Sequence, residues 1–125
     1  MATYCMEFIG GPEDFAGVAG EFNTLRLGLA WHKRLAPGDR LVLFRSKTAE
    51  AFGVAEVTRT EKARLPELLS AHARHNHKET GQPDPQGAPE RRRASMTKIY
   101  GPQRVTDGRY GTAIYMRMID HDFGV

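Results

Sequence analysis

Cysteine is almost absent from this chain, because Cys5 is the only one among 125 residues. A single cysteine cannot form an internal disulfide, so the fold is not a disulfide framework. This cysteine usage is typical of proteins from reducing compartments, and we expect a cytoplasmic location. We interpret Cys5 itself as a small, buried side chain within a strand.

Long apolar runs are absent as well. A membrane-spanning helix needs about 20 consecutive apolar residues, and no stretch of the sequence comes near that length. Residues 1–9 have no basic segment and include Glu7, so we interpret them as a strand and not as a signal peptide. The sequence therefore predicts no membrane partner.

Charge of one sign is only weakly in excess, with a formal net charge of +3. Such an excess permits an anionic partner without identifying one. Domains that bind nucleic acid usually show clustered positive charge. The basic clusters of this chain are Arg26, Lys33 with Arg34, Arg45 with Lys47, and Arg91 to Arg93. Their placement in the fold matters more than their total.

What the sequence does contain is the pattern of one small domain built from strands and helices. Leucines at helical spacing after Arg64 predict a helix, and Asp107-Gly108 predicts a hairpin turn. The prolines of 82–89 predict a surface loop, and we interpret 82–93 as a flexible insertion rich in Pro and Arg. The expected strands are 3–9, 24–28, 41–44, 52–60 and 113–119, and the short segments 104–106 and 109–112 flank the hairpin turn. The expected helices are 29–35, 65–76 and 91–100, and 13–21 is a weak helix.

The order of these elements favours hairpins over regular strand–helix–strand units. It predicts a single α+β domain over residues 1–125. We expect a small, mostly antiparallel β-barrel of five or six strands, with two or three helices packed at its side.

Several short features point to a family. A strand carries Thr24 and Arg26, a basic turn follows, Pro37-Gly38-Asp39 precedes an apolar strand, and the strand 53–57 leads to the leucine-bearing helix. In this order the chain resembles the ASCH domain of the PUA-like superfamily, over roughly residues 4–78, with 113–119 as the closing strand. The resemblance implies a PUA-like β-barrel with a cleft between barrel and helices that suits RNA or a nucleobase.

Some proteins of that family look like hydrolases of acetylated cytidine. They are similar in having a Lys and a Thr three residues apart on the strand before the basic turn, and a Glu on the later helix. An ungapped alignment puts Asn23, Arg26 and Asn76 at those places. None supplies the amine, hydroxyl or carboxylate chemistry of the family, so the amidohydrolase activity is not carried over. A shift of one residue would bring in Thr24 and still leave no Lys beside it.

Arg26 is the leading candidate for ligand binding. Leu25 and Leu27 alternate with it and are expected in the core, so Arg26 points either outward or into the cleft. A guanidinium can hold a phosphate or a base edge bidentately. The alternative is an exposed strand charge or a structural ion pair. Beside it, the candidate nucleic-acid or ligand-binding residues are Asn23, Thr24, Trp31, Lys33, Arg34, Arg45, Lys47, Asn76, Arg91, Arg92 and Arg93.

Each of the other groups also has a simpler interpretation. Trp31 beside cations suits single-stranded nucleic acid, but a Trp is more often a core residue. His72, His75 and His77 are close in sequence, yet no Cys lies near them and their spacing matches no zinc signature. We therefore expect no metal and no cofactor, and we take none of these residues as catalytic.

Three functions stay open at this point. The first is binding of RNA or a nucleobase without metal. The second is hydrolysis of a modified nucleoside or RNA by a rearranged site, in which histidines such as His32 could transfer protons. The third is a protein-interaction module that keeps the fold without the ligand.

Overall fold

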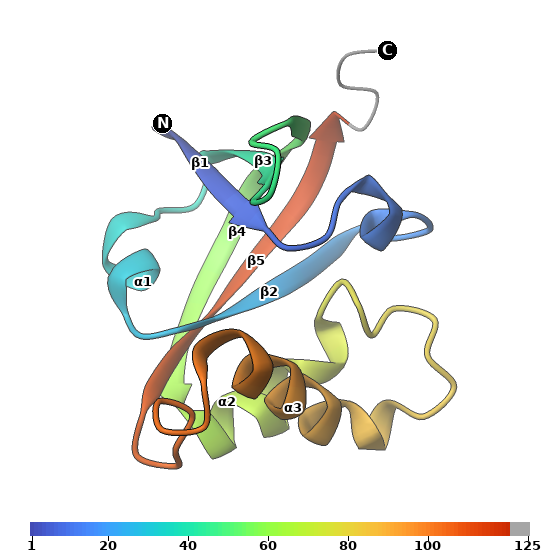
Figure 1. Ribbon diagram of the computed structural model, residues 1–125. Helices are drawn as coiled ribbons and strands as arrows, with labels where there is room; N and C mark the ends of the chain where they lie inside the picture. Colours follow the sequence, from blue (N-terminus) through green and yellow to red (C-terminus); the bar gives the residue numbers. More distant parts are fainter. Residues whose placement is uncertain (121–125) are drawn as a thin grey trace.

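The computed structural model describes residues 1–120. In this part of the chain, five strands form one mixed sheet in the order β1-β3-β4-β5-β2, and three α-helices accompany it (Figure 1). The α+β class and the strand count agree with the prediction. The expected burial of Cys5 was wrong, because its position on the first strand is exposed. The strands are β1 (Thr3–Phe8), β2 (Glu21–Leu27), β3 (Arg40–Arg45), β4 (Ala51–Arg64) and β5 (Tyr110–Asp120), and the helices are α1 (Ala30–Arg34), α2 (Leu65–His72) and α3 (Ala88–Tyr100).

The sheet is not a closed barrel. Strand β1 pairs with β3 in parallel, whereas the remaining neighbours are antiparallel. Within residues 1–120 no ladder joins the two edge strands β1 and β2. A side-chain contact does join them, because Arg26 on β2 donates a hydrogen bond of 2.8 Å to the carbonyl oxygen of Glu7 on β1. The gap between the edge strands is where the candidate site lies.

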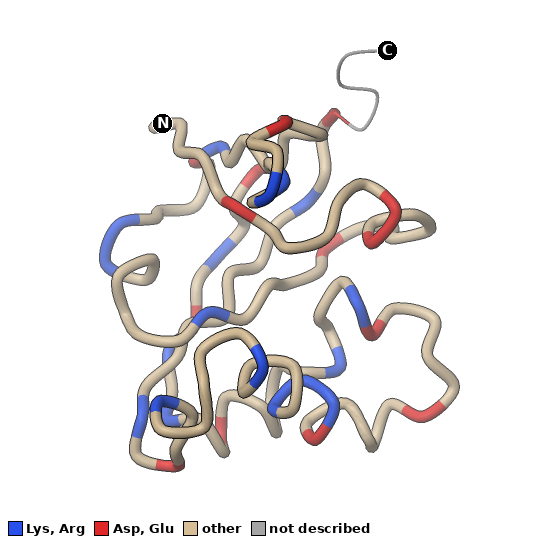
Figure 2. The backbone as a smooth tube through the Cα atoms, in the orientation of Figure 1, with Lys and Arg blue, Asp and Glu red and all other residues tan. Residues whose placement is uncertain are grey.

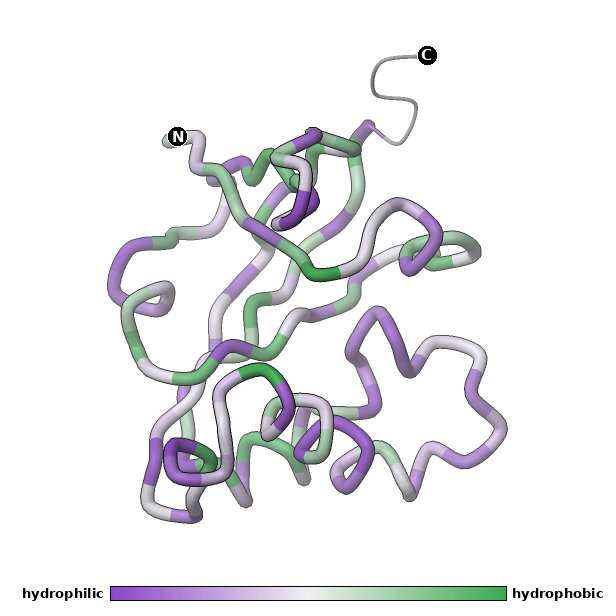
Figure 3. The backbone as a smooth tube through the Cα atoms, viewed as in Figure 1, coloured by the Kyte–Doolittle hydropathy of each residue, from purple (hydrophilic) through white to green (hydrophobic). Residues whose placement is uncertain are grey.

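Two hydrophobic clusters flank the sheet. One gathers strand residues such as Phe22, Leu41 and Ile114 around Phe15. Phe15 belongs to the 3-10 turn η1 (Pro12–Phe15), which is all that forms of the helix expected at 13–21. The other cluster packs β2 and β5 under α2 and α3, and the predicted leucine face of α2 is its centre: Leu65, Leu68 and Leu69 are buried. Figure 3 shows the apolar residues of the strands beside the hydrophilic segment that leads from α2 to α3.

The Pro37-Gly38-Asp39 turn has a structural explanation. Gly38 has a φ of 93°, a left-handed value that favours glycine. The carboxylate of Asp39 accepts hydrogen bonds of 2.9 Å from the backbone N–H groups of Ala2 and Ala36. These bonds lower the pKa of Asp39. The turn therefore fixes the start of β3 next to the start of β1.

Two predictions about the C-terminal half were wrong. Helix α3 begins at Ala88, with Pro89 in its first turn, so residues 88–93 are helical and not part of a loop. The hairpin expected around Asp107-Gly108 does not form, because residues 104–106 are not a strand and the N–H of buried Val105 donates to the carbonyl of Gly101. Strand β5 starts only at Tyr110.

None of the helices described within residues 1–120 has the length and apolar character that spanning a bilayer requires.

Candidate functional site

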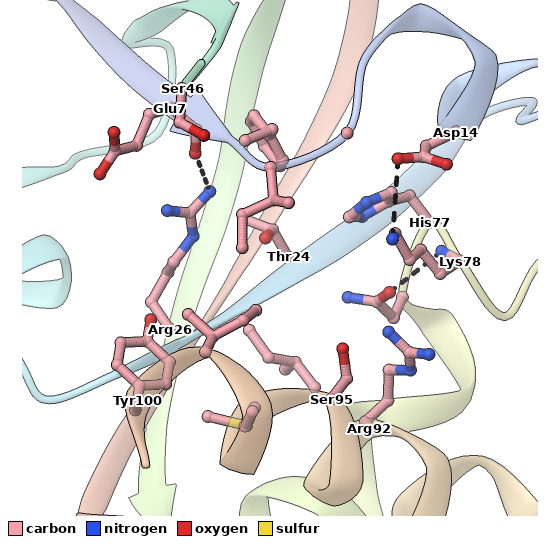
Figure 4. A pocket seen from close by; sticks show the side chains of 17 residues that line it. Glu7, Asp14, Thr24, Arg26, Ser46, His77, Lys78, Arg92, Ser95 and Tyr100 are labelled. Carbon is pink, nitrogen blue, oxygen red and sulfur yellow. Dashed lines mark hydrogen bonds and ion pairs between the residues drawn. The ribbon is translucent and has the colours of Figure 1, made fainter.

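A cavity of about 280 Å³ opens between the edge strands and α3. We call it the edge cleft. Its walls come from the end of β1, the middle of β2, the chain after α2 and one face of α3 (Figure 4). The lining residues are Glu7, Phe8, Ile9, Gly10, Asp14, Thr24, Leu25, Arg26, Ser46, Asn76, His77, Lys78, Arg92, Ser95, Met96, Ile99 and Tyr100.

Arg26 lies at one end of the edge cleft. Its guanidinium carbon sits 4.7 Å from the centre of the Phe8 ring, and its Nη2 is the group bonded to the Glu7 carbonyl. Burial lowers the pKa of Arg26, but a guanidinium still stays charged in a protein. None of the salt bridges within residues 1–120 includes Arg26. The hydrogen bond and the ring contact of Arg26 are thus made with neutral groups, and the Glu7 carboxylate acts on its charge only from beyond ion-pair distance.

Thr24 stands two residues before Arg26 on the same face of β2. Its side chain is buried and lines the middle of the edge cleft between the two polar ends (Figure 4). Because side chains alternate along a strand, Thr24 and Arg26 share this face with Phe22. The sequence predicted this pairing of Thr24 with Arg26.

The far end of the edge cleft is built by the chain that leaves α2. After the 3-10 turn η2 (Ala73–His75), Asn76 and His77 bind back to β2: the amide Nδ2 of Asn76 and the backbone N–H of His77 both donate to the carbonyl oxygen of Asn23. Lys78 follows, with its Nζ 3.7 Å from Asp14. These contacts bring residues from the helical half of the chain to the strand that carries Arg26.

His77 is neutral in this wall. Its ring stacks on Phe15 with 4.5 Å between centres and an interplanar angle of 7°. Burial is the main cause that lowers the pKa of His77 to about 3. The Nδ1 atom of the ring has no hydrogen-bond partner within the described part of the chain. At neutral pH His77 therefore supplies a polar but uncharged surface.

One face of α3 closes the edge cleft on the other side. Arg92, Ser95, Met96, Ile99 and Tyr100 follow one another at helical spacing and all line the cavity. Sequence reasoning missed all of this face except Arg92. The three- and four-residue spacing was visible in the sequence, but its polar and apolar members gave no simple apolar stripe.

The arginine run of α3 is held by acidic residues. The buried carboxylate of Glu79 accepts hydrogen bonds from the Nε atoms of Arg91 at 3.0 Å and of Arg92 at 2.8 Å. Arg91 also pairs with Asp84, and Arg93 lies 2.8 Å from Asp107. Only Arg92 of this run lines the edge cleft, and its charge is paired with the Glu79 carboxylate. These side chains therefore do not form a free phosphate-binding arm.

The remaining predicted residues lie outside the cavity lining. Asn23 is fully buried, and its Nδ2 donates 2.8 Å to the carbonyl of His72. Arg45 pairs with Glu13 at 3.0 Å. On α1, Arg34 lies over the rings of Trp31 and Tyr4, at 5.0 and 6.0 Å from their centres. Lys33 and Lys47 are exposed on other surfaces. Of the predicted residues, the edge cleft brings together Thr24, Arg26, Asn76 and Arg92.

The three histidines at and after the end of α2 do not meet at one point. His72 shares a hydrogen bond of 2.6 Å with the hydroxyl of Tyr115, and His75 lies against the same ring, whereas His77 packs on Phe15. In residues 1–120 no group of three or more His, Cys, Asp or Glu side chains is arranged to hold a metal ion.

Charge is spread over the whole molecule and not concentrated on one surface (Figure 2). Within the cavity lining, the cations Arg26, Lys78 and Arg92 face the carboxylates Glu7 and Asp14. Lys78 and Arg92 form ion pairs with acidic partners, whereas no salt bridge within residues 1–120 includes Arg26.

Known structures share this architecture. An ASCH domain from Lactobacillus crispatus JV V101 matches 96% of this chain and 81% of its own, with a TM-score of 0.57 and 12% identity. The protein EF3133 from Enterococcus faecalis V583, of family DUF984, matches 98% of this chain and 78% of its own, with a TM-score of 0.63 and 8% identity. The hypothetical protein PH0355 matches 95% of this chain and all of its own, with a TM-score of 0.58 and 16% identity.

No protein-family model matches the sequence, and no curated protein matches it. The structural likeness is therefore a likeness of fold. This chain has an ASCH-like fold.

Proposed function

We propose that this protein binds RNA and that the edge cleft receives one of its nucleobases. The observation that carries the proposal is Arg26, a guanidinium without a carboxylate partner in residues 1–120 that is presented to a cavity by a carbonyl and an aromatic ring. An anionic or base-edge acceptor would complete the hydrogen bonding of this group. Arginine is the side chain best suited to such bidentate contacts.

The size and composition of the cavity support a small, flat, amphipathic ligand. A volume of about 280 Å³ is at the lower end for small-molecule pockets. Phe8, Leu25 and Met96 give it apolar walls. Thr24 lies at its middle and His77 at its far end (Figure 4), and Asn76 lines it as well. A heterocyclic base has this combination of an apolar face and a hydrogen-bonding edge.

We assign the phosphate contacts to the cations at the two ends of the edge cleft. Arg26 and Lys78 stand on opposite sides of Thr24 (Figure 4), so a strand whose base enters between them meets a cation on either side. Arg45, Arg91 and Arg93 are assigned no phosphate because each has an acidic partner outside the cavity. Lys33, Arg34 and Lys47 stay candidates for the path of a longer strand.

The test is a binding titration with short single-stranded RNA at about 50 and 200 mM salt. Two or three neutralised phosphates give a slope of log K against log salt of about −2, which is about a tenfold loss of affinity over this range. Absence of binding at the lower salt concentration removes the proposal.

The same samples discriminate the other functions. Incubation with acetylated cytidine or with labelled RNA returns the substrate intact if the protein is a binder, whereas a hydrolase gives free cytidine or shortened RNA. A protein-interaction module shows no salt-sensitive RNA binding and instead co-purifies with a protein partner.

A further inference from the structure

Two isoleucines at the edge cleft are exposed to solvent. Ile9, just after β1, is 60% exposed, and Ile99, in the last turn of α3, is 53% exposed. Both line the same cavity. An exposed apolar side chain alone needs no explanation, but two of them on opposite walls of one cavity make a feature of the site itself.

The walls that carry the two isoleucines face each other. Figure 4 shows the end of β1 above the cavity and α3 below it, with the β2 residues Thr24 and Arg26 between them. Phe8 lies next to Ile9 and Met96 lies one turn before Ile99. Both faces of the opening therefore carry apolar side chains, and the α3 face carries Ser95 beside them (Figure 4).

We propose that Ile9 and Ile99 form a clamp for the two faces of a single unpaired base, so that the ligand is a base displaced from a stack and not a paired duplex. We call these two residues the isoleucine clamp. This inference rests on the proposed function and adds what part of RNA is recognised. Proteins that take a base out of its stack commonly hold it between apolar side chains and read its edge by hydrogen bonds.

Charge supports this occupant over a purely apolar one. A hydrophobic peptide or lipid chain gains nothing from Arg26, whose charge has no carboxylate partner in residues 1–120. A nucleotide fits both features, because its ring contacts the isoleucine clamp and its phosphates contact Arg26 and Lys78. A base that is already paired is stacked on both faces and leaves no face free for the clamp.

The experiment compares three RNA hairpins of equal length. One carries a single bulged 2-aminopurine, the second an abasic site at the bulge, and the third is fully paired. We expect the bulged base to be bound about tenfold more tightly than the other two, with a change of 2-aminopurine fluorescence on binding. The salt slopes should be alike, because all three present the same phosphates.

Variants separate the clamp from general surface effects. Ile9→Ala and Ile99→Ala should each reduce the preference for the bulged base several-fold, and both should retain the wild-type unfolding midpoint because the side chains are exposed. Ile119→Ala is the matched control, since Ile119 is 46% exposed on β5 and outside the cavity lining. It should leave the preference unchanged.

The outcomes distinguish this inference from the function on which it rests. Equal, salt-sensitive binding of the three hairpins overturns the clamp and leaves RNA binding in place. A loss in Ile99→Ala that is the same for the abasic and the base-bearing RNA also overturns it. Absence of binding to any hairpin and to single-stranded RNA removes both.

Discussion

The two faces of β2 differ in what their polar residues do. On one face, Asn23 is fully buried and its Nδ2 donates to the carbonyl of His72, and Leu25 packs under the helices and reaches the edge cleft with its side chain. On the other face, the polar side chains of Thr24 and Arg26 line the edge cleft. Adjacent polar residues of one strand thus lie in the core and at the cavity. Polar character alone does not identify a site, because the face of the strand decides whether a polar group reaches the cavity.

The arginines differ in the same way. Arg26 is held by a carbonyl and a ring, whereas Arg91 and Arg92 share the buried carboxylate of Glu79. The density of charge in the sequence favoured the second group. The structure shows that compensated charges hold α3 in place, and that an arginine with no acidic partner in residues 1–120 occupies the cavity.

The largest effect on stability is expected from Glu79, the carboxylate that Arg91 and Arg92 share. Glu79→Ala should lower the free energy of unfolding by about 3 kcal/mol, because it leaves two arginines near the surface of α3 without their buried partner. Urea denaturation measures the change. Glu79→Gln keeps an acceptor oxygen and should lose less, and an unchanged midpoint for Glu79→Ala contradicts the structural role.

The second effect is a pH dependence that originates at His77. Its pKa in the folded protein is about 3, below the value of about 6.5 in the unfolded chain. The unfolded state therefore binds more protons between these values, so stability is complete above about pH 6.5 and is lost as the pH falls toward 3. Between pH 7 and 4.5 the loss from this group is roughly 2 kcal/mol.

His77→Phe is the matched variant for this prediction, since a phenyl ring can keep the stacking on Phe15. Its unfolding free energy should fall less than that of the wild type between pH 7 and 4.5. The carboxylates are the same in both proteins, so their contribution to the pH dependence cancels in the comparison. Parallel pH curves for the two proteins would show that His77 is not buried in its neutral form.

The third prediction compares neighbours on β2. Asn23→Ala should lower the free energy of unfolding by about 1 to 2 kcal/mol, because the carbonyl of His72 loses its donor. Thr24→Ala should change the free energy of unfolding less than Asn23→Ala does, and it should change RNA affinity more. Equilibrium denaturation and a binding titration on both variants check the contrast, and the reverse order of effects would contradict the assignment of the two faces.

The smallest expected change in free energy is the one that tests ligand binding most specifically. Arg26→Ala should weaken RNA binding about tenfold, or about 1.4 kcal/mol, and reduce the magnitude of the salt slope by about 0.7. Arg104→Ala is the control, because Arg104 is exposed and outside the cavity lining. Equal affinities for the two variants contradict the role of Arg26.

Much of this fold was predictable from local pattern. Alternation along 24–28 correctly placed Thr24 and Arg26 on one face, and the leucine spacing of α2 predicted its buried side. The start of β2 was missed by three residues, because Glu21 to Asn23 break the alternation that marked the strand. The alternation of side chains along a strand carries no information on how strongly the sheet curves. The sequence therefore led to the prediction of a closed barrel where the sheet is open.

The site was harder to predict than the fold. Its walls come from β1, β2 and α3, which are far apart in sequence and meet only through tertiary packing. Arg26 was identified from its place on β2. The α3 face of Ser95, Met96 and Ile99 was not, because nothing local says that this side of the helix meets the edge strands and not solvent. The pairing of Arg91 and Arg92 with buried Glu79 and the burial of Ala88 and Met96 in the core together hold the helix in this orientation.

The most direct test of the proposed function is a nuclear magnetic resonance titration of the labelled protein with short single-stranded RNA. The account predicts chemical-shift changes confined to amides around the edge cleft: residues 7–10 at the end of β1, Thr24 and Arg26 on β2, the segment 76–78, and the 92–100 face of α3. Changes centred instead on α1 and the 59–64 end of β4, with Arg26 unaffected, would contradict it.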